Sequence, residues 1–239
     1  MKITISGYGK MGKEIEQVAL QNNHSISTVL DTPADWKNHE AEIKGSDVII
    51  DFSQPNVVVS NIHKAFTLNT PIVVGTTGWD NQKEEVRQNC LTNNQALFVA
   101  SNFSIGVNIF FEINIQLARL MDSYPQYQPS IEEIHHTQKL DKPSGTAIEL
   151  AKQMLEQLGR MNKYTLDKKM KHSDLMIVSE RLDDIPGTHK VTYTSEVDQI
   201  EIKHTAKNRK GFATGAVMAA EWIVGKKGYF GMKDLLGIV

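Results

Sequence analysis

Residues 2–20 read KITISGYGKMGKEIEQVAL, and this stretch decides the fold of the first half of the chain. It begins with Lys2–Ser6, where apolar and polar side chains alternate, which predicts a strand. Further on, Ile15, Val18 and Ala19 recur at helical spacing, which predicts a helix with one buried face. Between them lie glycines in the pattern G-x-G-x-x-G. A strand, this glycine turn and a helix in succession predict a Rossmann-type dinucleotide-binding domain.

Each glycine in this turn has a physical task. Gly7 permits the tight turn, Gly9 lets the backbone approach a pyrophosphate without a Cβ in the way, and Gly12 allows the helix and strand to pack closely. The start of the helix adds free N–H groups and a partial positive charge. We expect the whole loop to bind the cofactor: Gly7, Tyr8, Gly9, Lys10, Met11 and Gly12. The alternative is that the glycines serve only the geometry of the turn, with no ligand.

An acidic residue, Asp31, ends the next predicted strand, about 20 residues after the glycine turn. A carboxylate there accepts hydrogen bonds from the adenosine ribose and repels a 2′-phosphate. The next residues, Thr32 and Pro33, offer no arginine to neutralise it. The sequence therefore favours NADH over NADPH as the cofactor. Lys10 and Lys37 could each reach a phosphate, which keeps NADPH open.

The rest of the first hundred residues alternates between strand patterns and helical patterns, which is typical of a parallel sheet with crossover helices. Further strands are predicted at Ser25–Leu30, Val48–Phe52, Ile72–Val74 and Leu97–Ala100. Ser53 and Asp80 are predicted to cap the helices that follow them.

After Asn102 the pattern changes, and we predict a second domain of the α+β type. A long apolar helix is expected at Ile105–Leu120, followed by a break and new strands. The predicted elements are a strand at Ile131–His136, a helix at Ala147–Leu158 ended by Gly159, three strands at Leu175–Ser179, Lys190–Thr194 and Gln199–His204, and a last helix at Ala213–Val224. The three strands resemble a meander, so the second sheet should be mixed or antiparallel with helices on one face.

The segment most informative about chemistry is EEIHHTQKLDKPSGT, residues 132–146. His135 and His136 are adjacent at a strand end, so their side chains point to different sides, and one can donate a proton while the other binds. Lys139 adds a cation that can hold a carboxylate or stabilise a developing anion.

The same segment ends in Ser144, Gly145 and Thr146, which open a helix whose free N–H groups form an anion site. Each residue of the segment has an ordinary alternative, because histidines are mostly structural, loop lysines are mostly solvated and S-G-T is a common cap. Together they describe a pocket for a small polyanion beside a general acid. With a hydride donor bound by the first domain, the sequence predicts reduction of a C=C or C=N bond in a carboxylate substrate.

The pattern H-H-x-x-K-x-D-x-P-S-G-T that starts at His135 resembles the signature of the 4-hydroxy-tetrahydrodipicolinate reductase family. Three further stretches are similar to that family: GTTGW at residues 75–79, ASNFSIGVN at 100–108 and GFATGAVMAAEW at 211–222. The resemblance implies NAD(P)H-dependent reduction of 4-hydroxy-tetrahydrodipicolinate to tetrahydrodipicolinate, in the diaminopimelate pathway of lysine biosynthesis. It also implies a dinucleotide-binding domain of residues 1–103 and 211–239 and a substrate-binding and oligomerisation domain of residues 104–210.

The resemblance assigns roles to single residues as well. It implies that His135 is the proton donor or acceptor, that Lys139 is its catalytic partner, and that His136, Gly145 and Thr146 bind the substrate, beside the Ser144 of the predicted anion site. Two loops are expected to contact the cofactor: Gly75, Thr76, Thr77, Ala100, Ser101, Asn102 and Phe103.

Two features depart from the family pattern. The glycine turn is one residue shorter than the family's G-x-G-G-R-M-G and has Lys10 in place of the arginine, so phosphate contacts are expected to shift. The region Glu180–Glu196 lacks part of a hairpin extension. Family members build a homotetramer with this sheet, and a homotetramer is therefore the expectation for this chain.

Composition excludes several other classes of protein. Lys and Arg number 26 against 28 Asp and Glu, so no overall field would hold the chain on a nucleic acid or an anionic membrane. The most apolar helix, Ala213–Val224, is too short to span a bilayer. The single cysteine, Cys90, and a first strand in place of a signal peptide favour the cytoplasm. No metal site is predicted.

Two other functions stay open at the level of sequence. Another Rossmann reductase, such as an aspartate or homoserine dehydrogenase-like enzyme, would share the glycine turn but would not need the segment 132–146. A non-catalytic dinucleotide sensor would have no use for His135 and Lys139.

Overall fold

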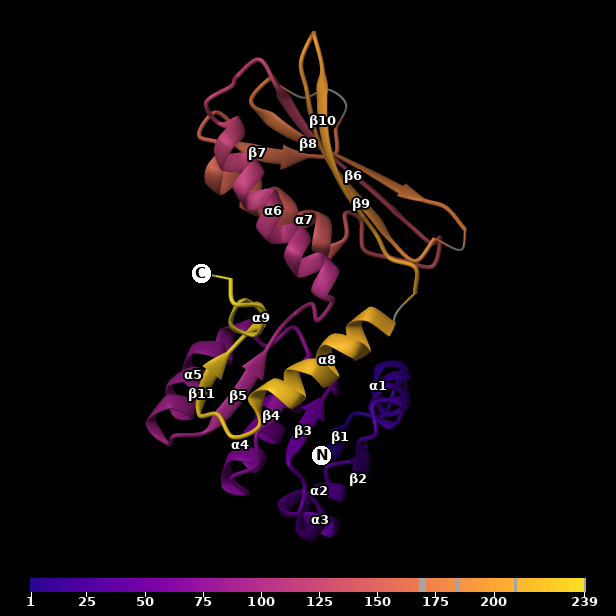
Figure 1. The fold of residues 1–239 in the computed structure, drawn as a ribbon, viewed down its shortest axis with the longest axis vertical. Helices are drawn as coiled ribbons and strands as arrows, with labels where there is room; N and C mark the ends of the chain where they lie inside the picture. Colours follow the sequence, from indigo (N-terminus) through magenta and orange to yellow (C-terminus); the bar gives the residue numbers. More distant parts are fainter. Residues whose placement is uncertain (168–170, 184, 209, 239) are drawn as a thin grey trace. The chain divides into compact units, whose positions relative to one another are not determined.

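The structure is a computed structural model that describes residues 1–167, 171–183, 185–208 and 210–238 (Figure 1). Contacts between Cα atoms divide the chain into two units. Unit 1 is Met1–Ile105 with Lys210–Val239, and unit 2 is Gly106–Arg209. The chain is α/β, as predicted.

Unit 1 contains a six-stranded sheet in the order β11-β5-β4-β3-β1-β2, in which every pairing is parallel. The strands are β1 (Lys2–Ser6), β2 (Ser25–Leu30), β3 (Val48–Asp51), β4 (Ile72–Val74), β5 (Ala96–Val99) and β11 (Gly228–Phe230). The bounds predicted for β1, β2 and β4 are confirmed, and those for β3 and β5 differ by one residue at their ends.

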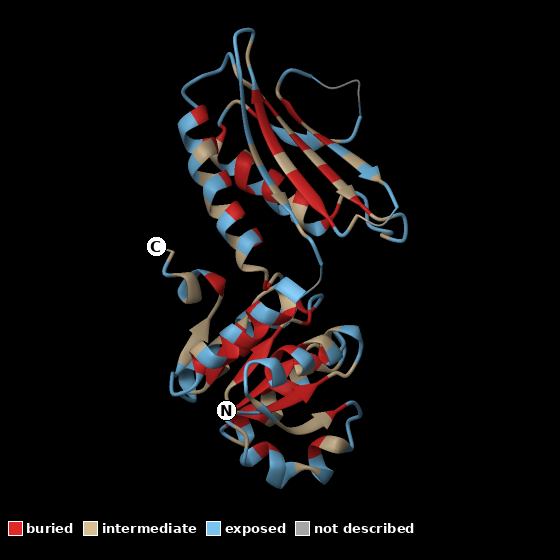
Figure 2. Ribbon diagram, turned by 45° about the vertical axis from the view of Figure 1, so that its right-hand side comes forward, coloured by how far each residue is buried: buried red, intermediate tan, exposed pale blue. Residues whose placement is uncertain are grey.

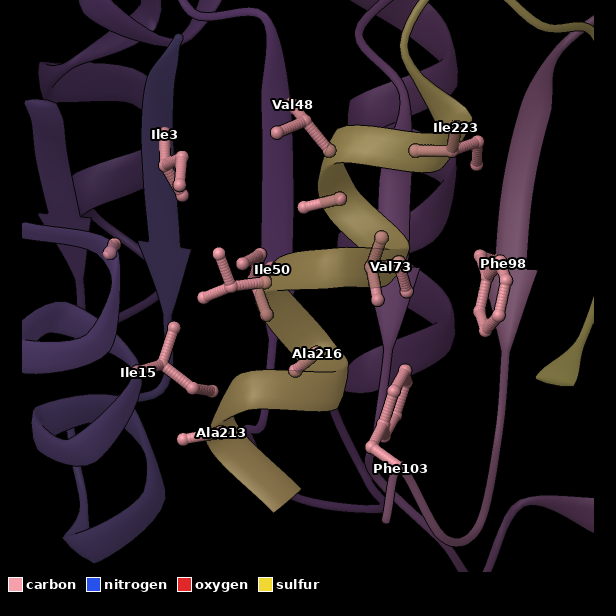
Figure 3. Close-up of a cluster of buried hydrophobic side chains, with 14 of the residues drawn as sticks. Ile3, Ile15, Val48, Ile50, Val73, Phe98, Phe103, Ala213, Ala216 and Ile223 are labelled. Atoms are coloured by element: carbon pink, nitrogen blue, oxygen red, sulfur yellow. The ribbon is translucent and has the colours of Figure 1, made fainter. Parts of the chain in front are cut away.

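The helices of unit 1 lie on both faces of this sheet and bury its two sides. They are α1 (Lys10–Gln21), α2 (Asp35–Asn38), α3 (Glu40–Lys44), α4 (Val58–Thr67), the 3₁₀ turn η1 (Asp80–Gln82), α5 (Lys83–Thr92), α8 (Lys210–Ile223) and α9 (Met232–Leu236). Successive residues of β3 enter different cores, because Ile50 packs with α1 and α8 while Ile49 packs with α4 and α5. Figure 3 shows α8 laid across the sheet, with Ala216 over the strands and Ala213 near Ile15 of α1.

Two predicted helix caps in unit 1 are wrong. The N-cap of α4 is Val57, and Ser53 instead donates a hydrogen bond to Asp51 at 2.7 Å. Asp80 lies inside the 3₁₀ turn η1, whose N-cap is Trp79, and pairs with Lys83 at 2.6 Å. In both places a polar residue near the helix start bonds to a local partner that the linear pattern does not reveal.

Unit 2 contains a five-stranded mixed sheet in the order β10-β9-β6-β8-β7. Its strands are β6 (Gln128–His135), β7 (Lys163–Thr165), β8 (Asp174–Arg181), β9 (Thr188–Thr194) and β10 (Gln199–Thr205). Its helices are α6 (Ile105–Met121), which begins at the last residue of the first segment of unit 1, and α7 (Gly145–Gln157). Both helices pack on one face of the sheet and share a core with it (Figure 1).

The predicted meander is only partly present in unit 2. β9 and β10 form an antiparallel pair, but β6 lies between β9 and β8 and pairs with β8 in parallel. Helix α7 lies between β6 and β8 in the sequence and provides the crossover that a parallel pair needs, so the order of elements already contained this information. The predicted cap Gly159 also differs, because α7 ends at Gln157 and Leu158 is its C-cap.

Burial follows the two sheets. Figure 2 shows buried residues concentrated along the strands of each unit and on one side of the helices that cover them. Within the residues that the structure describes, none of the helices combines the length and apolarity needed to cross a bilayer.

Candidate functional site

A cavity of about 660 Å³ lies in unit 1, where β1, β2 and β3 end. Parallel sheets bind ligands at this carboxyl edge, beyond the strand ends. The cavity is lined by Ser6, Gly7, Tyr8, Gly9, Leu30, Asp31, Thr32, Pro33, Trp36, Phe52, Ser53, Gln54, Asn56, Val57, Ser60, Asn61 and Lys64.

The glycine turn has the geometry that its spacing predicts. Gly7 has a φ of +85°, which disfavours any side chain, and a Cβ on Gly12 would lie 2.2 Å from the carbonyl oxygen of Gly7. Gly9 is the N-cap of α1, and apart from its two chain neighbours no described residue has an atom within 4 Å of where its Cβ would be. The backbone at Gly9 therefore faces open space at the start of a 12-residue helix, which suits a diphosphate.

The other loop residues differ in how they relate to the cavity. Tyr8 lines it and bonds through its hydroxyl to Glu16. Among the lysines that the structure describes, Lys64 lines the cavity, whereas Lys10 and Lys37 do not. Lys64 is therefore a third lysine, beside Lys10 and Lys37, to consider as a phosphate partner.

Asp31 directly follows the last residue of β2 and lines the cavity. Its Oδ1 accepts a hydrogen bond from the backbone N–H of Tyr8 at 3.0 Å, which joins the glycine turn to the strand end. The backbone N–H groups of Asp31 and Thr32 donate to Oδ2 of Asp35, at 2.9 and 2.7 Å.

A buried carboxylate, Asp51, links the strand ends behind the cavity, and no sequence pattern points to it. Asp51 is fully buried and accepts hydrogen bonds from the hydroxyls of Ser6, Ser53 and Thr76 at 2.7, 2.7 and 2.9 Å. The amide of Asn61 adds a fourth side-chain donor at 2.9 Å. Ser6 ends β1, Ser53 follows β3 and Thr76 follows β4. Their hydrogen bonds to Asp51 therefore hold the ends of three strands together behind the cavity.

The two loops expected near the nicotinamide follow β4 and β5 and lie outside the lining of the cavity. Gly75 packs against the ring of Phe52. Thr76 is buried, and its hydroxyl donates a hydrogen bond to Asp51. Asn102 accepts the N–H of Ser104 at 2.9 Å. Thr77 and Ser101 are exposed and Ala100 is partly buried.

Phe103 of the second loop belongs to the core. Its side chain is 1% exposed, and its ring lies 5.9 Å from that of Phe98 and 5.5 Å from that of Phe52. Any contact of Phe103 with a ligand therefore has to come from its backbone.

In unit 2 the predicted chemical residues gather at the end of β6. His135 is 7% exposed, and its Nδ1 lies 2.9 Å from Oε2 of Glu133, which is fully buried two residues earlier on the same face of the strand. Oε1 of Glu133 accepts a bond from Nη2 of Arg181 at 3.0 Å and from the N–H of Ser144 at 3.1 Å. Burial alone would raise the pKa of Glu133, but donors from His135, Ser144, Ser179 and Arg181 lower it well below its usual range.

Gly187 keeps the other face of the His135 ring open. It has a φ of +156°, and a Cβ there would lie 3.0 Å from Nε2 of His135. Because Nδ1 faces Glu133, Nε2 is the nitrogen left for a ligand.

Arg181 connects Glu133 to the loop that carries the predicted catalytic lysine. Besides Glu133, it donates from Nε to the carbonyl of Lys139 at 3.2 Å. The amine of Lys139 lies 2.8 Å from Oδ1 of Asp141, and its side chain is 25% exposed. A carboxylate ligand would compete with Asp141 for this amine.

The start of α7 has the predicted anion-site geometry. Ser144 is the N-cap, and its hydroxyl accepts the N–H of Ala147 at 3.2 Å. Gly145 is exposed and a Cβ there would meet no described atom within 4 Å, while Thr146 and His136 are partly buried. The structure therefore leaves the first turn of this 13-residue helix open beside the loop of Lys139.

His189 completes the cluster and was also not predicted. Its Nε2 lies 3.1 Å from the hydroxyl of Ser144 and 3.8 Å from Oε2 of Glu133. Burial, followed by the charge of His135, lowers the pKa of His189 to about 3, so its ring is neutral. Ligand-type atoms of Glu133, His135 and His189 lie within 4.8 Å of one another. The guanidinium of Arg181 on the same carboxylate disfavours a second cation there.

Comparisons with known proteins agree along the chain. Residues 1–103 match the family model for the N-terminus of dihydrodipicolinate reductase, and residues 106–236 match the model for its C-terminus. The 4-hydroxy-tetrahydrodipicolinate reductase of Christiangramia forsetii is 47% identical over 236 residues, with 99% of this chain and 98% of the relative covered. The enzyme of the same name from Methanoregula boonei is 36% identical and covers 82% of this chain and 76% of its own length.

A solved structure has the same fold. The dipicolinate-bound dihydrodipicolinate reductase from Paenisporosarcina sp. TG-14 superposes with a TM-score of 0.78 at 23% identity, over 100% of this chain and 99% of that one.

Proposed function

Because this chain belongs to the dihydrodipicolinate reductase family, we propose that it reduces 4-hydroxy-tetrahydrodipicolinate to tetrahydrodipicolinate in the diaminopimelate route to lysine. The observation that carries this proposal is the cluster at the end of β6, where His135, Lys139 and the open start of α7 lie together in one unit. The other unit holds a cavity of a size and position suited to a dinucleotide.

The residues of unit 1 fit a nicotinamide dinucleotide. The open backbone at Gly9 and the start of α1 would hold the diphosphate, and Asp31 would accept from the adenosine ribose. The loops after β4 and β5, at Gly75–Thr77 and Ala100–Phe103, would lie toward the nicotinamide. When bound, the reduced nicotinamide supplies the hydride. NADH is the favoured form, because a 2′-phosphate would meet the charge of Asp31.

The residues of unit 2 fit a small dicarboxylate. Free N–H groups at Gly145 and Thr146, with the hydroxyl of Ser144 and the ring of His136, would hold one carboxylate of the substrate. Lys139 would exchange its pairing with Asp141 for the substrate and would offset negative charge as it develops. These contacts orient the ring relative to His135.

His135 is proposed as the general acid, and Glu133 as the residue that positions it. The carboxylate at Nδ1 fixes the orientation of the imidazole and stabilises its protonated form, so that Nε2 presents the proton. Gly187 keeps the approach to Nε2 open. Loss of water from the 4-hydroxy compound leaves a C=C bond conjugated with the ring C=N bond, and proton transfer from Nε2 accompanies reduction of that C=C bond.

The direct test is a coupled assay with the intact chain. The substrate is generated in place from pyruvate and aspartate semialdehyde by the upstream synthase, and oxidation of NADH or NADPH is followed by absorbance. We expect loss of absorbance that depends on both precursors and a higher kcat/KM with NADH. If neither nucleotide is oxidised, the proposed reaction is rejected, and a non-catalytic dinucleotide sensor becomes the favoured alternative.

We also propose that the protein is a cytoplasmic homotetramer. Large apolar side chains of unit 2 are exposed on β8, on β10 and in the turn before β10, with Val178 43%, Ile200 38% and Val197 89% exposed. An interface through this sheet would bury them. Cys90 is a free thiol, as is usual in a reducing compartment. Light scattering coupled to gel filtration tests the assembly, and a monomer at micromolar concentration would reject it.

A further inference from the structure

We propose that Asp35 determines the cofactor preference of this enzyme by placing its own carboxylate where the 2′-phosphate of NADPH would bind. The proposal rests on the proposed function, namely that unit 1 binds a nicotinamide dinucleotide in the cavity at the strand ends. It goes further by naming a residue outside the glycine fingerprint that selects between the two nucleotides.

The first observation is the turn after β2. There the backbone N–H groups of Asp31 and Thr32 both point at one atom, Oδ2 of Asp35, at 2.9 and 2.7 Å. Two successive N–H groups directed at one point form an anion-binding arrangement. Hydrogen bonds from the backbone of Thr32 and of Asp31 lower the pKa of Asp35, so the carboxylate stays charged at neutral pH. The chain thus supplies the anion for its own anion site.

The second observation is where this site lies. Asp31 and Thr32 both line the cavity, and Asp31 bonds back to Tyr8 in the glycine turn. In a Rossmann domain the acid that ends the second strand faces the 2′-hydroxyl of the adenosine ribose. A phosphate on that hydroxyl would therefore lie beside this turn. It would find the N–H donors already bonded and would face the charges of Asp31 and Asp35 together.

The lysine that lines the cavity lies over an aromatic ring and is not paired with either carboxylate in the described residues. Lys64 lines the cavity, and its amine lies 5.4 Å from the centre of the Trp36 ring, in a cation–π contact. As a cation in the cavity lining, Lys64 is a candidate partner for a bound 2′-phosphate once the carboxylate of Asp35 is removed.

Asp35 also has a local structural role that the test has to separate from selection. It follows Thr32 by three residues and accepts the N–H of Thr32, a bond that ties the turn after β2 to the first residue of α2. A purely structural role predicts equal effects on all nucleotides, whereas selection predicts an effect confined to those with a 2′-phosphate.

The experiment compares two variants with a matched control. Asp35→Asn keeps an acceptor for the two N–H groups and removes the charge, and Asp35→Ala also frees the N–H groups. The control is Asp47→Asn, because Asp47 is another exposed carboxylate that accepts a backbone N–H, that of Lys2 at 2.7 Å, but Lys2, unlike the donors Asp31 and Thr32, does not line the cavity. Dissociation constants for NADH and NADPH are measured by fluorescence titration without substrate. AMP and adenosine 2′,5′-bisphosphate, which differ only in the 2′-phosphate, are measured as competitors.

We expect both Asp35 variants to tighten NADPH relative to NADH by about ten-fold, the effect of one exposed charge a few ångströms from a phosphate. Adenosine 2′,5′-bisphosphate should tighten relative to AMP by a similar factor, and Asp47→Asn should leave both ratios unchanged. Equal changes in the dissociation constants of NADH and NADPH would reject the role of Asp35 in selection but not the dinucleotide site. A wild-type chain that binds NADPH more tightly than NADH would have the same meaning. Failure of the wild-type chain to bind either nucleotide would overturn the dinucleotide site and this inference with it. Melting curves by circular dichroism establish that the variants are folded, and Asp35→Asn decides the question if Asp35→Ala is not.

Discussion

Replacing Glu133 by Gln should destabilise unit 2 and slow catalysis at the same time. Glu133 is fully buried, and its two oxygens are shared among Arg181, His135 and the N–H of Ser144. Glutamine keeps the volume and one acceptor oxygen, but it presents an NH₂ group to partners that are themselves donors. The change therefore isolates the charge and hydrogen-bond pattern from the packing.

The size of the effect follows from the partners left behind. Removing one partner of a buried ion pair typically costs about 3–5 kcal/mol. Arg181 retains three carbonyl acceptors, at Lys139, Glu180 and Asp141, and its side chain is 14% exposed, so it is not left entirely without partners. We therefore expect a loss of about 3 kcal/mol in the free energy of unfolding at pH 7, at the lower end of that range.

The loss should depend on pH with a definite sign. The pKa of Glu133 is lower in the folded chain than in the unfolded one, so its ionisation stabilises the fold above the unfolded pKa of about 4.3. This stabilisation is lost progressively as the pH falls below that value toward the folded pKa. The difference between wild type and Glu133→Gln should be constant from pH 8 to about 5 and shrink in more acidic solution.

Urea unfolding of the intact chain, followed by circular dichroism and by tryptophan fluorescence, measures this loss. Trp36, Trp79 and Trp222 all lie in unit 1, so a change seen by circular dichroism but not by fluorescence belongs to unit 2. Glu132→Gln is the matched control, because Glu132 is the neighbouring residue on β6 and forms a half-exposed pair with Lys190 at 3.0 Å. It should cost less than about 1 kcal/mol and leave kcat unchanged. A Glu133→Gln variant with wild-type kcat and a loss under about 1 kcal/mol at pH 7 would refute the reasoning.

Three further variants test the cluster around His135. His135→Gln should lower kcat by roughly 10² to 10⁴ with a smaller change in KM in the coupled assay, and a variant with full kcat would remove His135 from the role of proton donor. Thr146→Val keeps the shape of the side chain but loses its hydroxyl, so KM for the substrate should rise while kcat changes little; an unchanged KM would exclude a binding role. Gly187→Ala places a Cβ 3.0 Å from Nε2 of His135 at a φ of +156°, so it should lower both kcat and the melting temperature, whereas full activity would show that Nε2 is not the working nitrogen.

The fold of unit 1 could be predicted largely from local sequence, because each of its early strands is a short run rich in β-branched residues. The confirmed bounds of β1, β2 and β4 show how far that local information reaches. The predictions that Ser53 and Asp80 cap helices were wrong because each side chain bonds to another partner. Ser53 bonds to Asp51 and Asp80 to Lys83, and the folded turn brings each pair together.

The candidate site of unit 2 could be predicted only in part, for a different reason. His135 and Lys139 lie in one segment whose residue types suggest chemistry, and Glu133 could have been found there, since residues two apart on a strand share a face. Arg181 and His189 come from β8 and β9, more than 40 residues away, and they reach Glu133 only because β6 lies between those strands. The meander interpretation put β8 beside β9 and so separated these residues from β6.

The position of α8 and β11 in unit 1 has a consequence for synthesis on the ribosome. Both elements come from the final 30 residues, yet α8 lies across the sheet beside α1, and β11 is an edge strand next to β5. The nascent chain therefore exposes one apolar side of its first sheet until the residues of α8 and β11 have been synthesised. Unit 2, whose residues are contiguous, can complete its own core earlier. A released fragment that stops after β10 would accordingly carry an uncovered hydrophobic surface and be prone to aggregate.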